Sequence, residues 1–172
     1  MPFSGPSPES VWVRQTDPRV KPLLADLARE YSSRYHRVLA DVHHQLREYP
    51  VERFSPPDGG LLLLVVGGHA VAGGAFQRYD EETAELKRIW THRAHRRSGL
   101  ARRVVAELEA EAERRGYRRI HLTTGPNQPE ARELYLAAGY TPLFDVTDPP
   151  TANPLPFSRI LPSAVPARAA GA

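Results

Sequence analysis

The residues best suited to chemistry form a short basic loop, Arg93 to Gly99, directly before a helical pattern. From Leu100 onward, apolar residues recur about every fourth position, as in an amphipathic helix. The first N–H groups of a helix have no partner within the helix and carry partial positive charge, so they bind anions. The small residues Gly99 and Ala101 let a phosphate approach that backbone, and the loop arginines add positive charge. The pattern predicts a pyrophosphate-binding loop, although an ordinary strand-to-helix turn with a solvated basic face fits the same residues.

The spacing within this loop resembles that of a known family. Arg96-x-x-Gly99-x-Ala101 resembles the Arg/Gln-x-x-Gly-x-Gly/Ala signature of the Gcn5-related N-acetyltransferases, the GNAT superfamily. The preceding stretch, Ala84 to Trp90, alternates apolar and charged residues and is similar to the fourth strand of that superfamily. The resemblance therefore covers both the loop and the strand that leads into it.

A second stretch resembles another GNAT motif, Asn-x-x-Ala-x-x-x-Tyr-x-x-x-Gly-Phe. Here it reads Gln128-x-x-Ala131-x-x-x-Tyr135-x-x-x-Gly139-Tyr140, with glutamine in place of the usual asparagine. The resemblance is specific over residues 84–142 and looser over residues 10–161. It implies an α+β fold whose central sheet is mixed, mostly antiparallel and splayed, with about seven strands flanked by about four helices.

The resemblance also implies which residues hold acetyl-CoA, the acetyl donor of the family. Main-chain groups of Ile89 to Thr91 would bind the pantetheine arm like an added strand, and N–H groups from about Arg97 to Ala101 would bind the pyrophosphate. Arg102 or Arg103 could reach the 3′-phosphate, and either Asn127 or Gln128 could replace the motif asparagine. The residues expected at the cofactor are Ile89, Trp90, Thr91, Arg96, Arg97, Ser98, Gly99, Leu100, Ala101, Arg102, Asn127 and Gln128.

Acetyl transfer to an amine poses two proton problems. An alkyl ammonium has a pKa near ~10.4, so forming the free amine at neutral pH costs roughly 4 kcal/mol. The resemblance implies that Glu85 is the base and that Tyr135 gives a proton to the leaving thiolate. Alternatively, Glu85 is an edge glutamate paired with Lys87 or Arg78, and Tyr135 is a core tyrosine. Because the chain has no cysteine, direct attack in a ternary complex is favoured over an acyl-enzyme.

Composition narrows the class of protein further. A length of 172 residues suits one domain, for which we expect a flexible leader over 1–9, a GNAT domain over 10–162 and a disordered tail over 163–172. The longest apolar run, residues 61–66, is too short to cross a membrane, and the first residues lack a secretion signal. We therefore expect a cytoplasmic protein. Adjacent histidines at 43 and 44 point to different helix faces and no zinc-ligand spacing occurs, so no metal is expected.

Periodicity and turn residues predict the elements that must position these groups. The predicted order is βααβββαβαββ, with no internal repeat. The expected strands are 10–16, 61–66, 70–78, from about 84 to 90, 119–124, 140–146 and 155–161. The expected helices begin at Asp17, near Val38, at Gly99 and at Pro129, and glycines at 116 and 139 end the last two.

The predicted activity is acetyl-CoA-dependent transfer of an acetyl group to the primary amine of a small molecule. The first two helices and residues 147–154 are expected to line the acceptor site, and Tyr31, Arg34, Tyr35 and His36 suit an anionic or aromatic acceptor. A protein acetyltransferase and a non-catalytic acyl-CoA sensor are the alternatives. Nucleic-acid binding is not expected, because the basic stretch lacks interleaved aromatic residues. A homodimer is possible.

Overall fold

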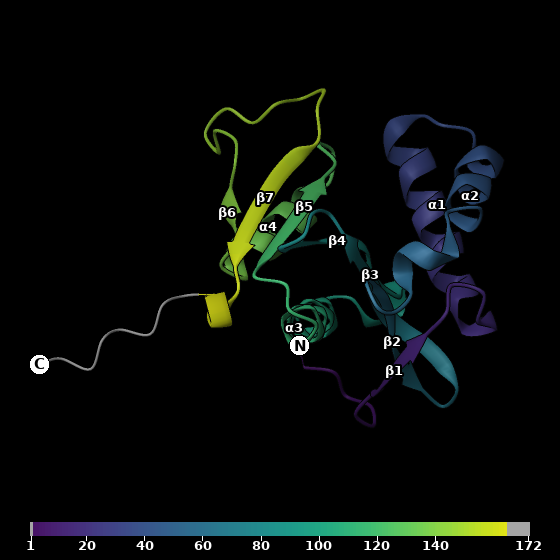
Figure 1. Ribbon diagram of the computed structural model, residues 1–172. Helices are drawn as coiled ribbons and strands as arrows, with labels where there is room; N and C mark the ends of the chain where they lie inside the picture. The colour runs from purple at the N-terminus through teal and green to yellow at the C-terminus, as the bar shows by residue number, and fades with distance from the viewer. Residues whose placement is uncertain (1, 165–172) are drawn as a thin grey trace, which may run out of the picture.

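The computed structural model describes residues 2–164, which form one open sheet with helices on both faces (Figure 1). The predicted element order is observed, with short 3-10 turns added. The strands are β1 (Glu9–Val13), β2 (Gly60–Val66), β3 (His69–Arg78), β4 (Thr83–Thr91), β5 (Arg119–Thr124), β6 (Thr141–Pro142) and β7 (Leu155–Ile160). The α-helices are α1 (Lys21–Tyr35), α2 (Leu39–Arg47), α3 (Leu100–Arg114) and α4 (Pro129–Ala137).

The sheet has the order β1-β2-β3-β4-β5-β7-β6, and only the β4–β5 pair is parallel. That pair is short, because β4 and β5 are in register only over Thr83 to Glu85 and Arg119 to His121. Beyond Glu85, β4 continues to Thr91 without a β5 partner, while β5 stays paired with β7 over its whole length. The mixed sheet is thus splayed between its fourth and fifth strands, which confirms the predicted fold class.

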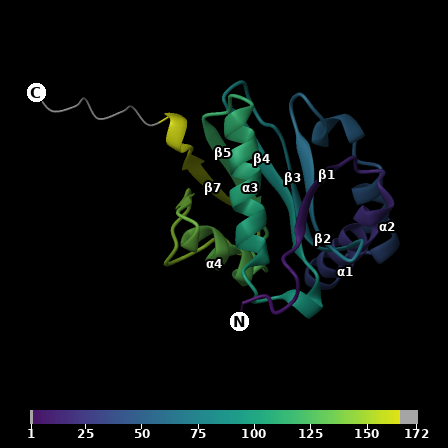
Figure 2. The same cartoon turned by 90° about the horizontal axis from the view of Figure 1, so that it is seen from below.

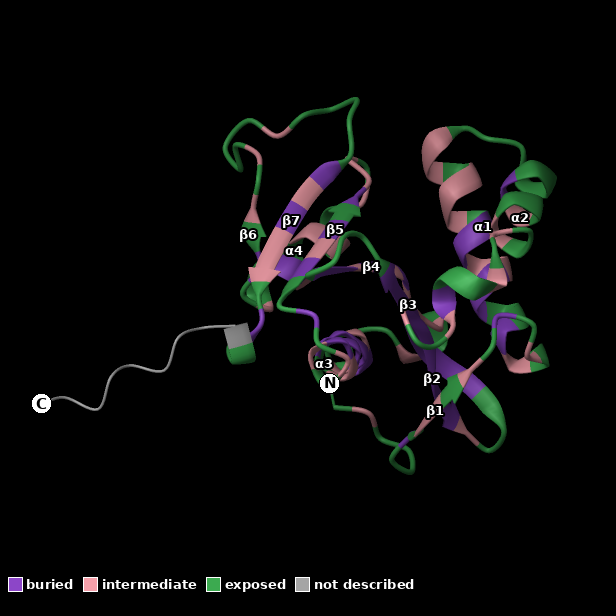
Figure 3. Ribbon diagram, in the orientation of Figure 1, coloured by how far each residue is buried: buried purple, intermediate pink, exposed green. Residues whose placement is uncertain are grey.

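β2 is buried on both faces of the sheet, which explains its unbroken apolar run. Leu62 and Leu64 pack toward α3, whereas Leu61 and Leu63 pack toward α1 on the opposite face. Figure 2 shows α3 crossing one face, and Figure 3 shows buried residues along β2 and β3. A strand that is covered on both faces reads as continuous apolar sequence rather than as an alternation.

Glycines set the ends of the two helices that approach the splayed edge. Gly116 and Gly139 follow α3 and α4 with φ angles of 97° and 87°. After α3, the N–H of Tyr117 donates to the Ala112 carbonyl at 3.1 Å. After α4, the N–H of Tyr140 donates to the Tyr135 carbonyl at 3.0 Å. Both ends are Schellman motifs, which require a left-handed residue and therefore favour glycine.

A bulge interrupts β4 where it borders the opening. The register of the β3–β4 pair shifts between Gly73 and Ala75 of β3, so that two β4 residues, Arg88 and Ile89, lie opposite Gly74. Arg88 has a φ of 61°, which is uncommon for a residue with a side chain. A Cβ at Gly74 would lie 2.6 Å from Cδ1 of Ile89, so a larger residue there would require the Ile89 side chain to shift. Bulges of this kind often lie next to active sites, where they change the direction of a side chain.

Some predicted boundaries were wrong. The strand expected over residues 140–146 is reduced to β6, because Asp145 accepts hydrogen bonds from the N–H and hydroxyl of Thr147 and starts a turn instead. The basic loop contains a 3-10 turn, Arg93–His95, that was not predicted.

The two ends of the chain are described only in part. In the expected leader, the Pro8 carbonyl accepts from Arg103 at 2.8 Å. Of the expected tail, Ser163 and Ala164 belong to a 3-10 turn and residues 165–172 lie outside the described part. None of the helices within residues 2–164 is long and apolar enough to cross a membrane.

Candidate active site

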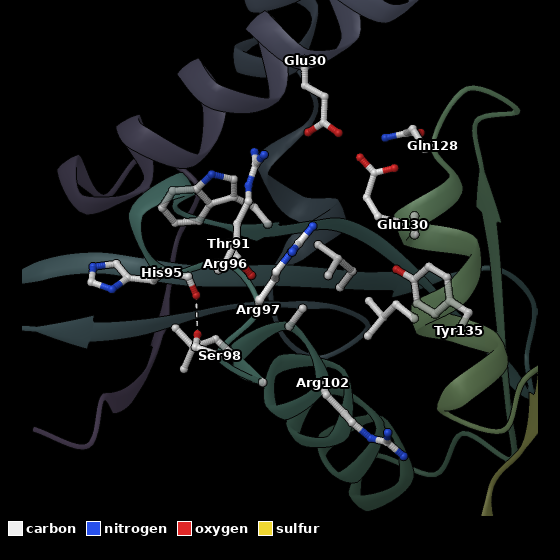
Figure 4. A pocket seen from close by; sticks show the side chains of 17 residues that line it. Glu30, Thr91, His95, Arg96, Arg97, Ser98, Arg102, Gln128, Glu130 and Tyr135 are labelled. Atoms are coloured by element: carbon white, nitrogen blue, oxygen red, sulfur yellow. Dashed lines mark hydrogen bonds between the residues drawn. The ribbon is translucent and has the colours of Figure 1, made fainter. Parts of the chain in front are cut away.

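A cavity of about 360 Å³ opens at the N-terminal end of α3, in the splay of the sheet. We call it the α3 cavity. It is bounded by the end of β4, the basic loop, the first turn of α3 and one side of α4 (Figure 4). Its lining includes these residues predicted at the cofactor: Ile89, Trp90, Thr91, Arg96, Arg97, Ser98, Gly99, Leu100, Ala101, Arg102 and Gln128. The structure thus brings together groups that lie up to 39 positions apart in the sequence (128 minus 89).

The first turn of α3 is open to the α3 cavity. Gly99 caps the helix with a φ of 80°, and no atom lies within 4 Å of the place that a Cβ would occupy. No acidic residue lies in the first turn, so the positive end of the helix is not neutralised there. The Thr91 hydroxyl is buried and has no hydrogen-bond partner within residues 2–164. These features leave room and unused donors for an anionic group.

Tyr135 lies on α4 across the α3 cavity from the basic loop (Figure 4). Its ring contacts Tyr140 and Phe157, with centroids 5.5 and 5.8 Å away. Burial raises the pKa of the Tyr135 phenol well above its ordinary value. The phenol therefore keeps its proton at neutral and mildly alkaline pH. Tyr135 is both a core residue and a cavity residue, so the two alternatives for it are compatible.

A second cavity, of about 720 Å³, lies between β4, α2 and the loop after β5. We call it the α2 cavity. Glu85 lines it and accepts a hydrogen bond from Gln77 Nε2 at 2.7 Å. Gln77 Oε1 in turn accepts from the Tyr49 hydroxyl at 2.5 Å. These hydrogen bonds orient the Glu85 carboxylate. The alternative pairing of Glu85 with Lys87 or Arg78 is not observed, because Arg78 pairs with Asp58.

The two cavities meet at Gln128, which lines both. The Gln128 Oε1 atom accepts from the Gly125 N–H at 3.0 Å and from the Tyr35 hydroxyl at 3.5 Å. The side-chain amide of Gln128 is therefore held at the junction. Asn127 lies beside it but lines only the α2 cavity of the two, and its Nδ2 donates to the Arg34 carbonyl at 3.1 Å.

Hydrogen bonds and an ion pair join α1 to the start of α4 next to this junction, although β4 and β5 are splayed apart in the sheet. Arg34 Nη1 donates to the Asn127 carbonyl at 2.8 Å, and Arg34 also pairs with Glu130. The hydrogen bond from Arg34 holds the pKa of Glu130 below its ordinary value. We call these contacts the α1–α4 bridge; its residues are Arg34, Tyr35, Asn127, Gln128 and Glu130.

Sequence reasoning missed several cavity residues. Glu30 and Glu130 line the α3 cavity, and both pair with Arg34. Glu30 lies on α1, far in sequence from either motif, so only the fold reveals it. Arg103, an alternative for the 3′-phosphate, instead donates to the Ser10 hydroxyl at 3.0 Å and pairs with Glu107. Within residues 2–164 no three His, Asp or Glu side chains gather as metal ligands, and the absence of a metal stays a prediction.

Replacing Gly125 by alanine should open the α1–α4 bridge. A Cβ at Gly125 would lie 1.6 Å from the Tyr35 hydroxyl oxygen, so the tyrosine ring must move away. Because the end of a side chain can move more easily than backbone, we expect a loss of only ~1–2 kcal/mol in the free energy of unfolding. Thermal unfolding measures this loss, and a variant with Tyr35→Phe, which removes the hydroxyl alone, should lose less. Unchanged stability in both variants would contradict a bridge that ties α1 to α4.

The fold of this chain is similar to those of several solved acetyltransferases. An acetyltransferase of the GNAT family from Staphylococcus aureus Mu50 superposes with a TM-score of 0.68 and 14% identity, covering 89% of this chain and 99% of that one. An aminoglycoside 6′-N-acetyltransferase in complex with coenzyme A superposes with a TM-score of 0.64 and 18% identity, covering 94% and 99%.

Sequence comparison identifies the family. The model described as the acetyltransferase (GNAT) family matches residues 21–140, and the chain belongs to this family. The uncharacterized N-acetyltransferase YsnE of Bacillus subtilis strain 168 is 38% identical over 76 residues, which are 42% of this chain and 50% of that protein. The match thus spans about half the length of this curated relative. The predicted family is confirmed.

Proposed function

We propose that the protein transfers an acetyl group from acetyl-CoA to the primary amine of a small molecule, by direct attack in a ternary complex. The observation that supports this most strongly is the pair of cavities joined at Gln128. One cavity has the features of a phosphate-binding helix start, and the other presents a carboxylate. The α2 cavity is within the size range of small-molecule sites, ~300–1,000 Å³. This supports a small acceptor over a protein.

The α3 cavity fits the cofactor. The open space at Gly99, the α3 N-terminus and the arginines at 96, 97 and 102 would hold the pyrophosphate and the 3′-phosphate. The exposed edge of β4 at residues 89–91 would bind the pantetheine arm, and Gln128 would replace the motif asparagine. When bound, acetyl-CoA supplies an acetyl group activated as a thioester, which an amine takes up with release of the thiol.

The chain's own residues have two proton tasks. Glu85, oriented by Gln77, would take a proton from the acceptor ammonium, directly or through water. Tyr135, which stays protonated, would give its phenolic proton to the sulfur as the thiolate leaves. Each group lines the cavity in which its task arises, with Glu85 on the acceptor side and Tyr135 on the cofactor side.

Replacing Glu85 by glutamine should lower kcat/KM near neutral pH by ~100-fold, because glutamine cannot take a proton. The deficit should shrink as the pH approaches the pKa of the amine, since the free amine is then already present. Release of free thiol from acetyl-CoA over a panel of amines measures the rate at each pH. The control is Glu81→Gln, an exposed turn residue with the same charge change.

Two outcomes of this experiment bear on separate parts of the proposal. Equal rates for wild type and Glu85→Gln at neutral pH would exclude Glu85 as the base while leaving the transferase function intact. Micromolar binding of acetyl-CoA with no transfer to any amine would instead favour the non-catalytic sensor, the second candidate function.

A further inference from the structure

The charges in the α2 cavity are unusual for a site that accepts an amine. Three basic side chains, Arg37, Lys87 and Arg88, line it together with a single carboxylate, Glu85. An amine acceptor arrives as a cation at neutral pH, so three further cations would repel it. The charges of the cavity therefore favour an acceptor that carries a negatively charged group in addition to its amine.

None of these four charges is neutralised by a partner of opposite sign in the described part of the chain. The Glu85 carboxylate accepts from the neutral amide of Gln77. Arg37 donates to the neutral amide of Gln45 at 2.5 Å. Lys87 is half-buried, and its ammonium makes no hydrogen bond or ion pair with residues 2–164. Along β4 (Thr83–Thr91), Glu85 thus precedes Lys87 and Arg88, and no ion pair joins these charges within residues 2–164.

Arg88 is the most informative of these groups because it is 8% exposed. Its guanidinium donates to Gln15 Oε1 at 2.5 Å and to the Leu46 carbonyl at 2.7 Å, both neutral acceptors. It also lies over the Tyr49 and Phe54 rings, 5.2 and 4.9 Å from their centroids. Burial lowers its pKa to about 10, so Arg88 is still charged at neutral pH.

A buried charge without a counter-ion is destabilising, and it is usually compensated by an anion. Arg88 is positioned by the β4 bulge and lines a cavity that is large enough for a ligand. A planar guanidinium binds carboxylates through paired hydrogen bonds, which makes arginine well suited to that group.

We propose that the acceptor is an amino-acid-like molecule, an amine that also carries a carboxylate. This inference rests on the proposed transferase function. Its amine lies toward Glu85 and its carboxylate lies toward Lys87 and Arg88. The same charges would disfavour polycationic acceptors.

Matched amines test this inference. Acetyl-CoA and the full chain are incubated with α-amino acids and with ω-amino acids of increasing length. Each amino acid is paired with the plain alkylamine and the diamine of the same length, so that chain length stays matched. We expect the best carboxylate-bearing acceptor to exceed its plain and diamine counterparts in kcat/KM by about tenfold or more, the effect of one charged hydrogen bond. Equal rates within each set would overturn the inference and leave the transferase function standing.

Charge reversal at Lys87 gives a sharper test, because the Lys87 ammonium makes no hydrogen bond or ion pair within residues 2–164, so its replacement breaks none there. Lys87→Glu should lower kcat/KM for the carboxylate-bearing amine by about tenfold and raise it for the diamine. Arg47→Glu makes the same charge reversal on the exposed surface of α2, where the arginine is 59% exposed, and should leave the preference unchanged. A preference that stays the same in Lys87→Glu would contradict the proposal.

Binding of a carboxylate can be measured without any acetyl transfer, so it tests the carboxylate site independently of the proposed transferase function. Simple alkyl carboxylates, which carry no amine, are titrated calorimetrically into the protein saturated with CoA, as wild type and as Lys87→Glu. Heat with wild type that is lost in Lys87→Glu supports a carboxylate site. If no amine is acetylated, the transferase function fails, and this titration still decides the inference: absence of binding to wild type overturns it.

Discussion

Gly99→Glu should weaken the binding of acetyl-CoA and of CoA by about 100-fold or more, which is ~2.7 kcal/mol of binding free energy. The added carboxylate would stand at the helix start, where the pyrophosphate is proposed to bind, and repel it. No atom lies within 4 Å of the Cβ position in the free protein, so the folded structure has space for the new side chain. Isothermal titration with each ligand measures the loss.

Two variants control for the backbone. Gly99→Gln adds the same bulk and the same left-handed strain without the charge, so it should bind more tightly than Gly99→Glu. Gly116→Glu adds the same charge at the other end of α3, at a glycine with a φ of 97° and open space around it. It should bind both ligands as wild type does. Wild-type binding by Gly99→Glu would show that the ligand does not use this helix start.

Tyr135→Phe should lower kcat by ~100-fold to 10⁴-fold while leaving the Kd for CoA almost unchanged. The ring would keep its contacts with Tyr140 and Phe157, and only the proton donor would be lost. Burst kinetics or single-turnover measurements would separate the chemical step from product release. Tyr140→Phe, which removes a buried hydroxyl from the same aromatic cluster, is the matched control and should keep wild-type kcat.

The pH dependence of the wild type gives an independent check on Tyr135. Because its pKa is raised by burial, the proton that it donates is bound more tightly than in a free tyrosine. The donor thus stays protonated as the pH rises toward ~10, the ordinary tyrosine pKa. We expect kcat to show no alkaline decline between neutral pH and that point. A decline below pH ~9 that disappears in Tyr135→Phe would mean that the phenol ionises too early for this role.

Local signals predicted most of the fold. The expected strand over residues 119–124 matches β5, and the glycines at 116 and 139 end their helices as predicted. These features depend on neighbours in sequence, such as side-chain alternation and a left-handed residue after a helix. The predicted strand over residues 140–146 failed because Asp145 starts a turn, and an apolar run at a sheet edge gives no warning of that.

The candidate site was only partly predictable. The two motifs located the loop and the face of α4 that line the α3 cavity, because the spacing of motif residues is itself a local property. The α1–α4 bridge joins positions about 90 residues apart, such as Arg34 and Asn127, and no local pattern signals such a contact. The β4 bulge was equally hidden, since Arg88 reads as one more charged residue in an alternating strand.

Because β4 and β5 pair only over a few residues, the backbone amides of β4 can report whether a ligand is bound beside this strand. Beyond Glu85, β4 still pairs with β3, but its other edge no longer faces β5 in register. Amide protons on that edge should exchange with deuterium faster than their neighbours bonded to β3. A bound molecule that pairs with the edge would slow them selectively. Deuterium uptake over residues 86–91 could thus be used to test candidate ligands individually for binding, without knowledge of the acceptor.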